Sequence, residues 1–190
     1  QAIMRVARRP AIEILESRTL LNAAITSAIA PSNVATAAGR GASVAATPFA
    51  VVVPTLQVTV GKGHARLVRF TDPDGTAAQV VLGGPGAATV TLTGNGLSQS
   101  TTRAGIATVT GTPQSVSIAT AGTTGASSLN ITGHGGNGVV NIAGITTDGA
   151  LGNINGPNAA LSGNLSAAAA VSSTRLASAG GGTIAIGAGG

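Results

Sequence analysis

LNITGHGGNGVVNIAGITTDGALGNING, residues 129–156, contains three strand-sized pieces, LNITG, VVNIAG and LGNING, each of which ends in glycine. Similar pieces recur between residues 104 and 190, at irregular intervals of about 11 to 22 residues. Stacked rungs of a parallel β-helix suit this composition, because inward Val, Ile and Leu fill a narrow core while glycine turns the corners. We therefore expect residues 119–190 to begin a parallel β-helix, or β-solenoid.

The sequence before these pieces follows a second pattern. In it, LQVTV is followed by GKG, ARLVRF by TDPDGT and AQVVL by GGPGA. Alternating β-branched residues, separated by Gly, Pro and Asp, are typical of strands joined by tight turns. This pattern predicts a short antiparallel β-unit over residues 49–118, and the fold class of the chain is then all-β. Residues 31–48, rich in Ala, Ser, Gly and Pro, are interpreted as a linker.

The composition limits both the core and the classes of site. Only 1% of the 190 residues are aromatic and 8% are charged, whereas 43% are hydrophobic. The core must therefore be built from small and β-branched side chains. Because the chain has no cysteine, disulfides and thiolate metal sites are excluded. The most hydrophobic run, FAVVVPTLQVTV, is too short to span a bilayer, which predicts no transmembrane helix.

The net charge of +5 and the isoelectric point near 11.7 raise the question of nucleic-acid binding. These values reflect ten basic residues set against only five carboxylates. No internal stretch clusters the cations, and the chain has no Trp or Tyr on which bases could stack. We therefore expect no nucleic-acid partner.

Residues 1–30 are typical of a targeting segment, disordered or helical, in which an Arg-containing start precedes the apolar run LLNAAITSAIA. The triplet Ala28-Ile29-Ala30 has the small-x-small form of a signal-peptidase site. The alternative is an amphipathic surface helix that has Ile12, Leu15 and Leu20 on one face.

Beyond residue 30, acid, base or metal chemistry depends on five side chains: Asp72, Asp74, Asp148, His64 and His134. Asp72 and Asp74 lie in TDPDGT, and this sequence has two interpretations. The carboxylates could supply two ligands of a calcium site, or they could stabilise a tight turn between strands. Because calcium requires six or more oxygen ligands, the turn is favoured.

A second calcium candidate is GGNGVVNIA, residues 135–143, which nearly matches the β-roll nonapeptide G-G-x-G-x-D-x-U-x. Val140 stands where the Asp ligand belongs, so we expect a glycine-rich turn between rungs. His134, just before it, is expected to face solvent. A calcium-dependent β-roll is kept as an alternative.

Catalysis on a β-helix, as in pectin lyases and related enzymes, requires converging carboxylates with Lys or Arg. Residues 104–190 contain only Asp148 and Arg175 as charged side chains. We therefore expect no enzyme activity, no catalytic residue, no cofactor and no metal site.

LESRTLL, residues 15–21, resembles the LEPR-XLL N-terminal motif of exported planctomycetal proteins. Its fixed positions are occupied by Leu15, Glu16, Arg18, Leu20 and Leu21, and Ser17 replaces the proline. GITTDGALGNINGPNAALSGNLS is similar to the repetitive β-strand regions found behind that motif. The resemblance implies a large secreted or cell-surface protein of structural or adhesive type, in which LESRTLL is a targeting motif.

These observations predict a non-catalytic structural or adhesive protein, secreted or at the cell surface. An uncharged wall rich in Thr, Ser and Asn would contact extracellular polysaccharide or neighbouring surface proteins, and the first 30 residues would engage the export machinery. The sequence stops at TIAIGAGG without an evident cap, which favours an N-terminal fragment of a longer protein. The alternatives are an export and anchoring module of a larger enzyme or binding protein, and the calcium-dependent β-roll.

Overall fold

A computed structural model describes residues 53–188, and this part of the chain is all-β, as the sequence predicts. Its strands are β1 (Thr55–Gly61), β2 (Leu67–Thr71), β3 (Ala77–Gly83), β4 (Ala87–Thr101), β5 (Ile106–Ala121), β6 (Ser128–His134), β7 (Val140–Ile142), β8 (Gly144–Thr147), β9 (Leu151–Leu161), β10 (Leu165–Ala167), β11 (Val171–Ala179) and β12 (Ile184–Ile186). Between residues 53 and 188 there is no helix that could cross a membrane. The predicted targeting segment, linker and LEPR-XLL-like motif lie outside the described residues.

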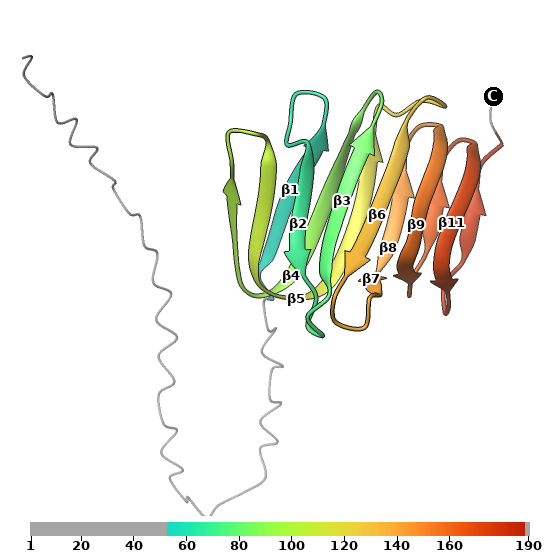
Figure 1. Cartoon of the computed structure of the whole chain (residues 1–190). Helices are drawn as coiled ribbons and strands as arrows, with labels where there is room; N and C mark the ends of the chain where they lie inside the picture. The colour runs from blue at the N-terminus through green and yellow to red at the C-terminus, as the bar shows by residue number, and fades with distance from the viewer. Residues whose placement is uncertain (1–52, 189–190) are drawn as a thin grey trace, which may run out of the picture. The chain divides into compact units, whose positions relative to one another are not determined.

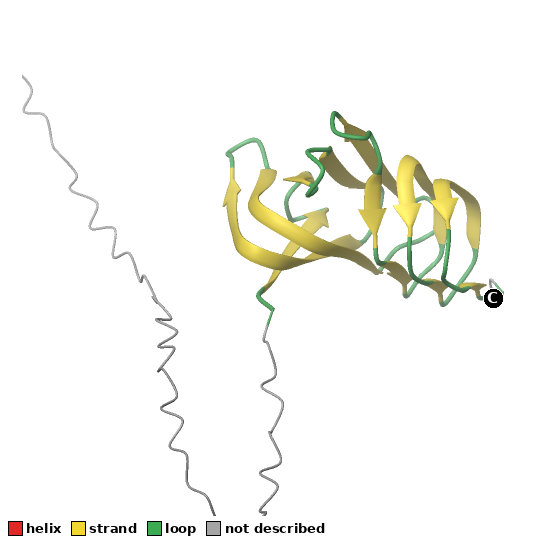
Figure 2. Cartoon of the chain, turned by 90° about the horizontal axis from the view of Figure 1, so that it is seen from below, coloured by secondary structure: helices red, strands yellow, loops and turns green. Residues whose placement is uncertain are grey.

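All of the strands belong to one curled sheet (Figure 1). Its order is β11-β9-β6-β3-β2-β5-β8-β10-β12, while β4 pairs with β5 and β1, and β7 pairs with β9. The sheet turns over along the long β4–β5 hairpin, so that its two arms face each other (Figure 2). We call the arm with β1, β8, β10 and β12 layer A; it includes residues 87–93 of β4 and 115–121 of β5. Layer B contains β2, β3, β6, β9 and β11, together with residues 106–108 of β5, which lie beside β2.

The bend in the β4–β5 hairpin depends on glycine. Its register shifts after Thr93, at Gly94, as in a β-bulge. A Cβ on Gly94 would overlap the carbonyl oxygen of Thr112, which faces it across the hairpin. Gly111 has a φ of 108°, a conformation that other residues rarely adopt. Side chains at these two positions would therefore oppose the curvature that brings the layers together.

The strand pairing changes along the chain. β1–β4, β4–β5, β2–β3 and β3–β6 are antiparallel, whereas β5–β8, β8–β10, β10–β12, β6–β9, β7–β9 and β9–β11 are parallel. β2–β5 is the one parallel pair among the first five strands. The boundary expected at residue 118 lies inside β5, and β3–β6 pairs strands from both sides of it. The described residues form one compact unit. The antiparallel and parallel regions are therefore parts of one sheet.

Successive parallel coils pass close to one another. The hydrogen bonds between them join residues that are about 20 positions apart in the sequence. The Ser162 hydroxyl donates to the Ile142 carbonyl 20 residues earlier, and the Thr183 amide donates to Asn164 Oδ1 19 residues earlier. At the same corner, a Cβ on Gly163 would overlap the carbonyl oxygen of Ala143. Glycine is required here because the coils approach too closely for a side chain.

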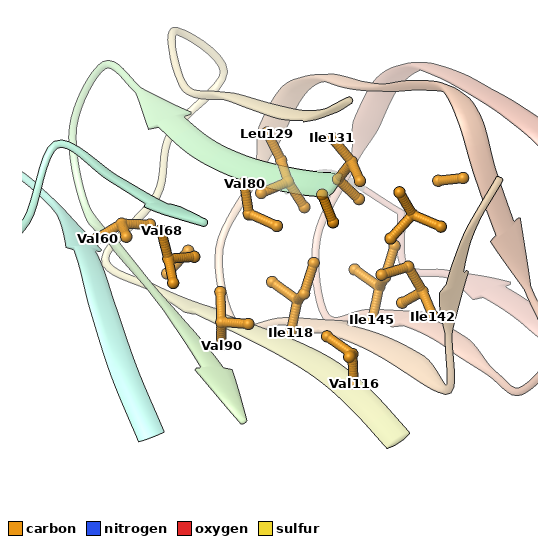
Figure 3. Close-up of a cluster of buried hydrophobic side chains, with 14 of the residues drawn as sticks. Val60, Val68, Val80, Val90, Val116, Ile118, Leu129, Ile131, Ile142 and Ile145 are labelled. Carbon is orange, nitrogen blue, oxygen red and sulfur yellow. The ribbon is translucent and has the colours of Figure 1, made fainter. Parts of the chain in front are cut away.

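The core lies between the layers and is almost entirely aliphatic. In β1, β2, β3, β6, β8 and β10 buried residues alternate with more exposed ones, as period-2 patterning requires, whereas β11 and β12 have no buried residue. In-register stacking places Val58, Val90, Ile118, Ile145 and Leu165 along layer A, and all five are buried. Val90, Ile118 and Ile145 of this row face Val80, Leu129 and Ile131 of layer B (Figure 3). Burying each of these side chains contributes about 1.5–3 kcal/mol. Phe70 is the one aromatic residue of this core among residues 53–188.

The last coil is less covered than the earlier ones. Ile184 continues the inward row of Ile145 and Leu165, both fully buried, yet it is 52% exposed. Ile186 is 46% exposed. Among the described strands, β12 pairs only with β10, so one edge and part of one apolar row face solvent.

Candidate functional site

The outer surface of layer A carries rows of small hydroxyl side chains. Because neighbouring strands are in register, Thr59, Thr89, Ala119, Thr146 and Ser166 follow one another across five strands. Each is flanked along its own strand by inward residues of the core. Thr146 and Ser166 are exposed, and Thr59 and Thr89 are half-buried between their neighbours.

Two shorter rows lie beside the first. One contains Gln57, Thr91, Ser117 and Gly144, and the other contains Thr55, Thr93 and Ser115. We call the three rows together the hydroxyl face. Neighbouring strands are about 4.8 Å apart and alternate residues along a strand are about 6.8 Å apart, so the hydroxyls form a two-dimensional grid. The three rows contain no charged side chain.

The hydroxyl face has most of its hydrogen-bonding capacity directed outward. Within its rows, the described structure has one side-chain hydrogen bond, between the hydroxyls of Thr59 and Thr89 at 3.3 Å. A hydroxyl can both donate and accept, so each remaining Thr or Ser side chain of the rows offers both to a ligand, whereas Ala119 and Gly144 offer neither. The methyl groups of threonine add apolar surface beside each hydroxyl.

The outer surface of layer B has a different character. A groove of about 640 Å³ crosses β5, β2, β3 and β6, and among its lining side chains are Arg69, Thr71, Gln79, Thr108, Thr132 and His134. Register places Thr108, Arg69, Gln79 and Thr132 in one row across these strands. We call it the Arg69 groove.

Arg69 is held in place by its neighbour on β3. Its Nε donates a hydrogen bond to Gln79 Oε1 at 3.2 Å. No Asp or Glu lines the groove. The positive charge of the guanidinium is therefore not neutralised by a carboxylate within the groove.

TDPDGT, the first calcium candidate, forms the tight turn that its sequence favours. The Asp72 side chain is 5% exposed, and its Oδ2 accepts the amide of Asn141 at 3.1 Å. Burial raises the pKa of Asp72, the Asn141 hydrogen bond lowers it, and the charge of Asp74 raises it. Asp74 Oδ1 accepts the Thr76 amide at 2.9 Å, and hydrogen bonds from Thr76 lower the pKa of Asp74.

GGNGVVNIA, the second calcium candidate, lies against the first. The Thr76 hydroxyl lies within hydrogen-bonding distance of the Gly135 carbonyl, at 3.3 Å, and of Asn137 Oδ1, at 3.4 Å, and these two oxygens share its one proton. Val140, at the position of the missing Asp ligand, is fully buried in the core. The carboxylate oxygens of Asp72 and Asp74 accept backbone N–H groups. The hydrogen bond from the Asn141 amide to Asp72 joins the two calcium candidates. No group of three or more His, Asp or Glu side chains that could hold a metal occurs between residues 53 and 188.

The other candidates are separate from this turn. His64 is exposed in the β1–β2 turn. Asp148 is exposed, and its carboxylate oxygens accept the Gly122 amide at 3.1 and 3.3 Å. His134 is exposed and lines the Arg69 groove. The structure therefore does not bring the five candidate side chains together into one site.

The targeting-motif residues lie outside the described part of the chain: Leu15, Glu16, Arg18, Leu20 and Leu21.

A scan against protein-family models, a search of curated proteins and a search of solved structures each found no match.

The Arg69 groove is absent from the sequence-based expectations, although a signal for it exists. ARLVRF and AQVVL alternate so that Arg69 and Gln79 fall on the outward positions of their strands. That pattern alone does not reveal that β2 lies between β3 and β5, which is what assembles the groove.

Proposed function

We propose that this chain is a non-catalytic, β-solenoid-type part of an exported surface protein, and that its hydroxyl face adheres to neutral extracellular polysaccharide. The observation that carries the proposal is the in-register set of Thr and Ser rows, which is uncharged and extends across β1, β4, β5, β8 and β10. The parallel pairing of β8, β10 and β12 in one layer, and of β6, β9 and β11 in the other, supports the solenoid assignment.

The proposed mechanism is architectural. Sugar hydroxyls exchange hydrogen bonds with Thr and Ser, and threonine methyl groups pack against the apolar faces of sugar rings. Each such contact is weak, with a net hydrogen bond contributing about 0.5–1.5 kcal/mol. Because the sheet already holds the side chains in rows, little ordering is needed on binding, and several weak contacts can act together.

A pull-down with microcrystalline cellulose and chitin tests the proposal. The variant Thr146→Lys/Ser166→Lys places two ammonium groups on the hydroxyl face, at positions paired across β8 and β10. The matched control is Asn153→Lys/Ser173→Lys, which alters a pair across β9 and β11 on the other layer. We expect the first variant to lose most binding and the control to retain it. Equal retention by both variants, or no binding by the native chain to either polymer, would refute the polysaccharide role.

A second experiment addresses export and the anchoring-module alternative. Fractionation of cells that make the native protein should place it outside the cytoplasm; recovery only from the cytoplasm would contradict export. The complete reading frame separates the two functional alternatives. Further coils would support a structural protein, and a catalytic domain would support an anchoring module.

A further inference from the structure

The Arg69 groove has the dimensions of a binding site for a small ligand or for one or two units of a polymer. Its volume of about 640 Å³ lies within the range of small-molecule sites, about 300–1,000 Å³. It is built on four paired strands of the sheet, which hold their side chains more firmly than a loop would. The groove is therefore a pre-formed surface feature.

The charge of the groove selects an anionic group. Arg69 is the arginine of the lining, and no carboxylate opposes it. The hydrogen bond from its Nε to Gln79 Oε1 restricts the guanidinium plane and leaves the two terminal nitrogens to donate. Two parallel donors of this kind match the two oxygens of a carboxylate.

The side chains around Arg69 match a sugar. Thr108 lies on one side of it in the same row, and Gln79 and Thr132 lie on the other. These groups can donate to and accept from hydroxyls on both sides of a bound carboxylate. We propose that the Arg69 groove binds a carboxylated sugar, a uronic acid unit of an acidic polysaccharide, with the carboxylate on the Arg69 guanidinium and ring hydroxyls on Thr108 and Thr132.

This inference concerns layer B and does not depend on the hydroxyl face. If both proposals hold, layer A contacts neutral polymer and layer B contacts acidic polymer. The layers can be tested separately, because Thr146→Lys/Ser166→Lys alters one and substitutions of Arg69 alter the other.

Calorimetric titration of the full chain with trigalacturonate, and with its methyl ester as the uncharged probe, tests the proposal. The variants are Arg69→Gln and Arg69→Lys, and the control is Arg175→Gln, an exposed arginine on β11 of the same layer. We expect Arg69→Gln to weaken trigalacturonate binding about 10- to 100-fold, the scale of a lost charged hydrogen bond. Arg69→Lys should weaken it less, and Arg175→Gln should leave it unchanged.

The methyl ester should bind at least about tenfold more weakly than the acid. Three outcomes would overturn the proposal: no trigalacturonate binding by the native chain, equal binding by Arg69→Gln, or equal binding of acid and ester. Equal affinity for a triglutamate peptide would overturn the sugar assignment, because the groove would then recognise carboxylates alone. A Tm unchanged in Arg69→Gln shows that the variant is folded, since Arg69 is outside the core.

Discussion

The antiparallel and parallel regions of this sheet differ in how many of their glycines require a positive φ. Among the described residues, every glycine with positive φ except Gly181 precedes residue 139, in the region of hairpins and turns. In the parallel coils, Gly163 and Gly182 lack positive φ but lie where an added Cβ would overlap the carbonyl oxygen of the preceding coil. Positive φ is therefore a requirement mainly of the first region, whereas close approach is required in both, at Gly94 in the β4–β5 hairpin and at Gly163 and Gly182 in the coils. A glycine-rich sequence alone does not distinguish these two requirements.

The largest expected effect concerns the apolar rows that both regions share. Ile145→Ala removes a fully buried side chain between Ile118 and Leu165, and we expect a loss of about 2–5 kcal/mol in the free energy of unfolding. Ile184→Ala, in the same row but 52% exposed, should cost about 0.5 kcal/mol or less. Urea denaturation monitored by circular dichroism measures both. Equal losses would mean that the last coil is covered in solution.

The second prediction tests close approach in the coils. Gly163→Ala forces a Cβ against the Ala143 carbonyl, and we expect a loss of about 1–3 kcal/mol. The control is Gly180→Ala, where an added Cβ meets nothing within 4 Å and φ is not positive. It should leave stability unchanged or raise it by up to about 1 kcal/mol. If the two variants have the same denaturation midpoint, the coils can separate enough to admit a side chain.

The third prediction tests conformation in the antiparallel region. Gly75 has a φ of 87° and open space around its Cα, so Gly75→Ala adds backbone strain without a clash. We expect a loss of about 1–2 kcal/mol, the cost of a left-handed conformation for an ordinary residue. Gly75→Asn should lose less, because Asn tolerates this region better. Identical unfolding energies for the two variants would argue against strain as the cause.

The smallest effect concerns the contact between turns at Asp72. Burial raises the pKa of this carboxyl above its ordinary value of 3.8, so the folded state binds its proton more tightly than the unfolded state. The contribution of Asp72 to the free energy of unfolding is therefore fully present below pH 3.8 and is lost as the pH rises through the raised pKa. Asp72→Asn keeps an acceptor for the Asn141 amide and loses the charge.

As the pH rises from about 3 to about 7, through the ordinary pKa of 3.8, the free energy of unfolding of Asp72→Asn should increase relative to that of the native chain. Denaturation of both proteins at these two pH values measures this difference. Asp74 has the opposite pH dependence: its pKa is lowered, so its contribution to stability is present above the ordinary pKa of an aspartate and is lost as the pH falls. Asp74 is therefore kept in both proteins, so that only the contribution of Asp72 differs. Asp72→Ala is the control, because it leaves the Asn141 amide without its acceptor and should cost about 1–3 kcal/mol. A pH-independent difference between native and Asp72→Asn proteins would contradict the burial argument.

Local pattern was sufficient to predict the all-β fold. The alternation in LQVTV and AQVVL places Val58 and Val80 inward, and both are buried. TDPDGT forms the tight turn that Pro and Gly favour, between β2 and β3. These features depend on neighbours within a few residues, so they can be read from short stretches of sequence.

Strand partners could not be predicted in the same way. β2 pairs with β5 although β3 and β4 intervene along the chain, and β3 pairs with β6 although β4 and β5 intervene. Alternation specifies which face of a strand is buried but not which strand lies beside it. For this reason the Arg69 groove and the contact between the turns of Asp72 and Asn137 emerge only from the assembled sheet.

The β4–β5 hairpin has a consequence for the order of folding. Its strands of 15 and 16 residues are adjacent in sequence, so their pairing closes only a short loop. Pairing of β3 with β6 requires closure over the whole hairpin, and such non-local contacts form more slowly. We expect the hairpin to form first and to offer its edges as a template to β1, β2 and β8. The bend at Gly94 and Gly111 then fixes the curvature before any coil is stacked.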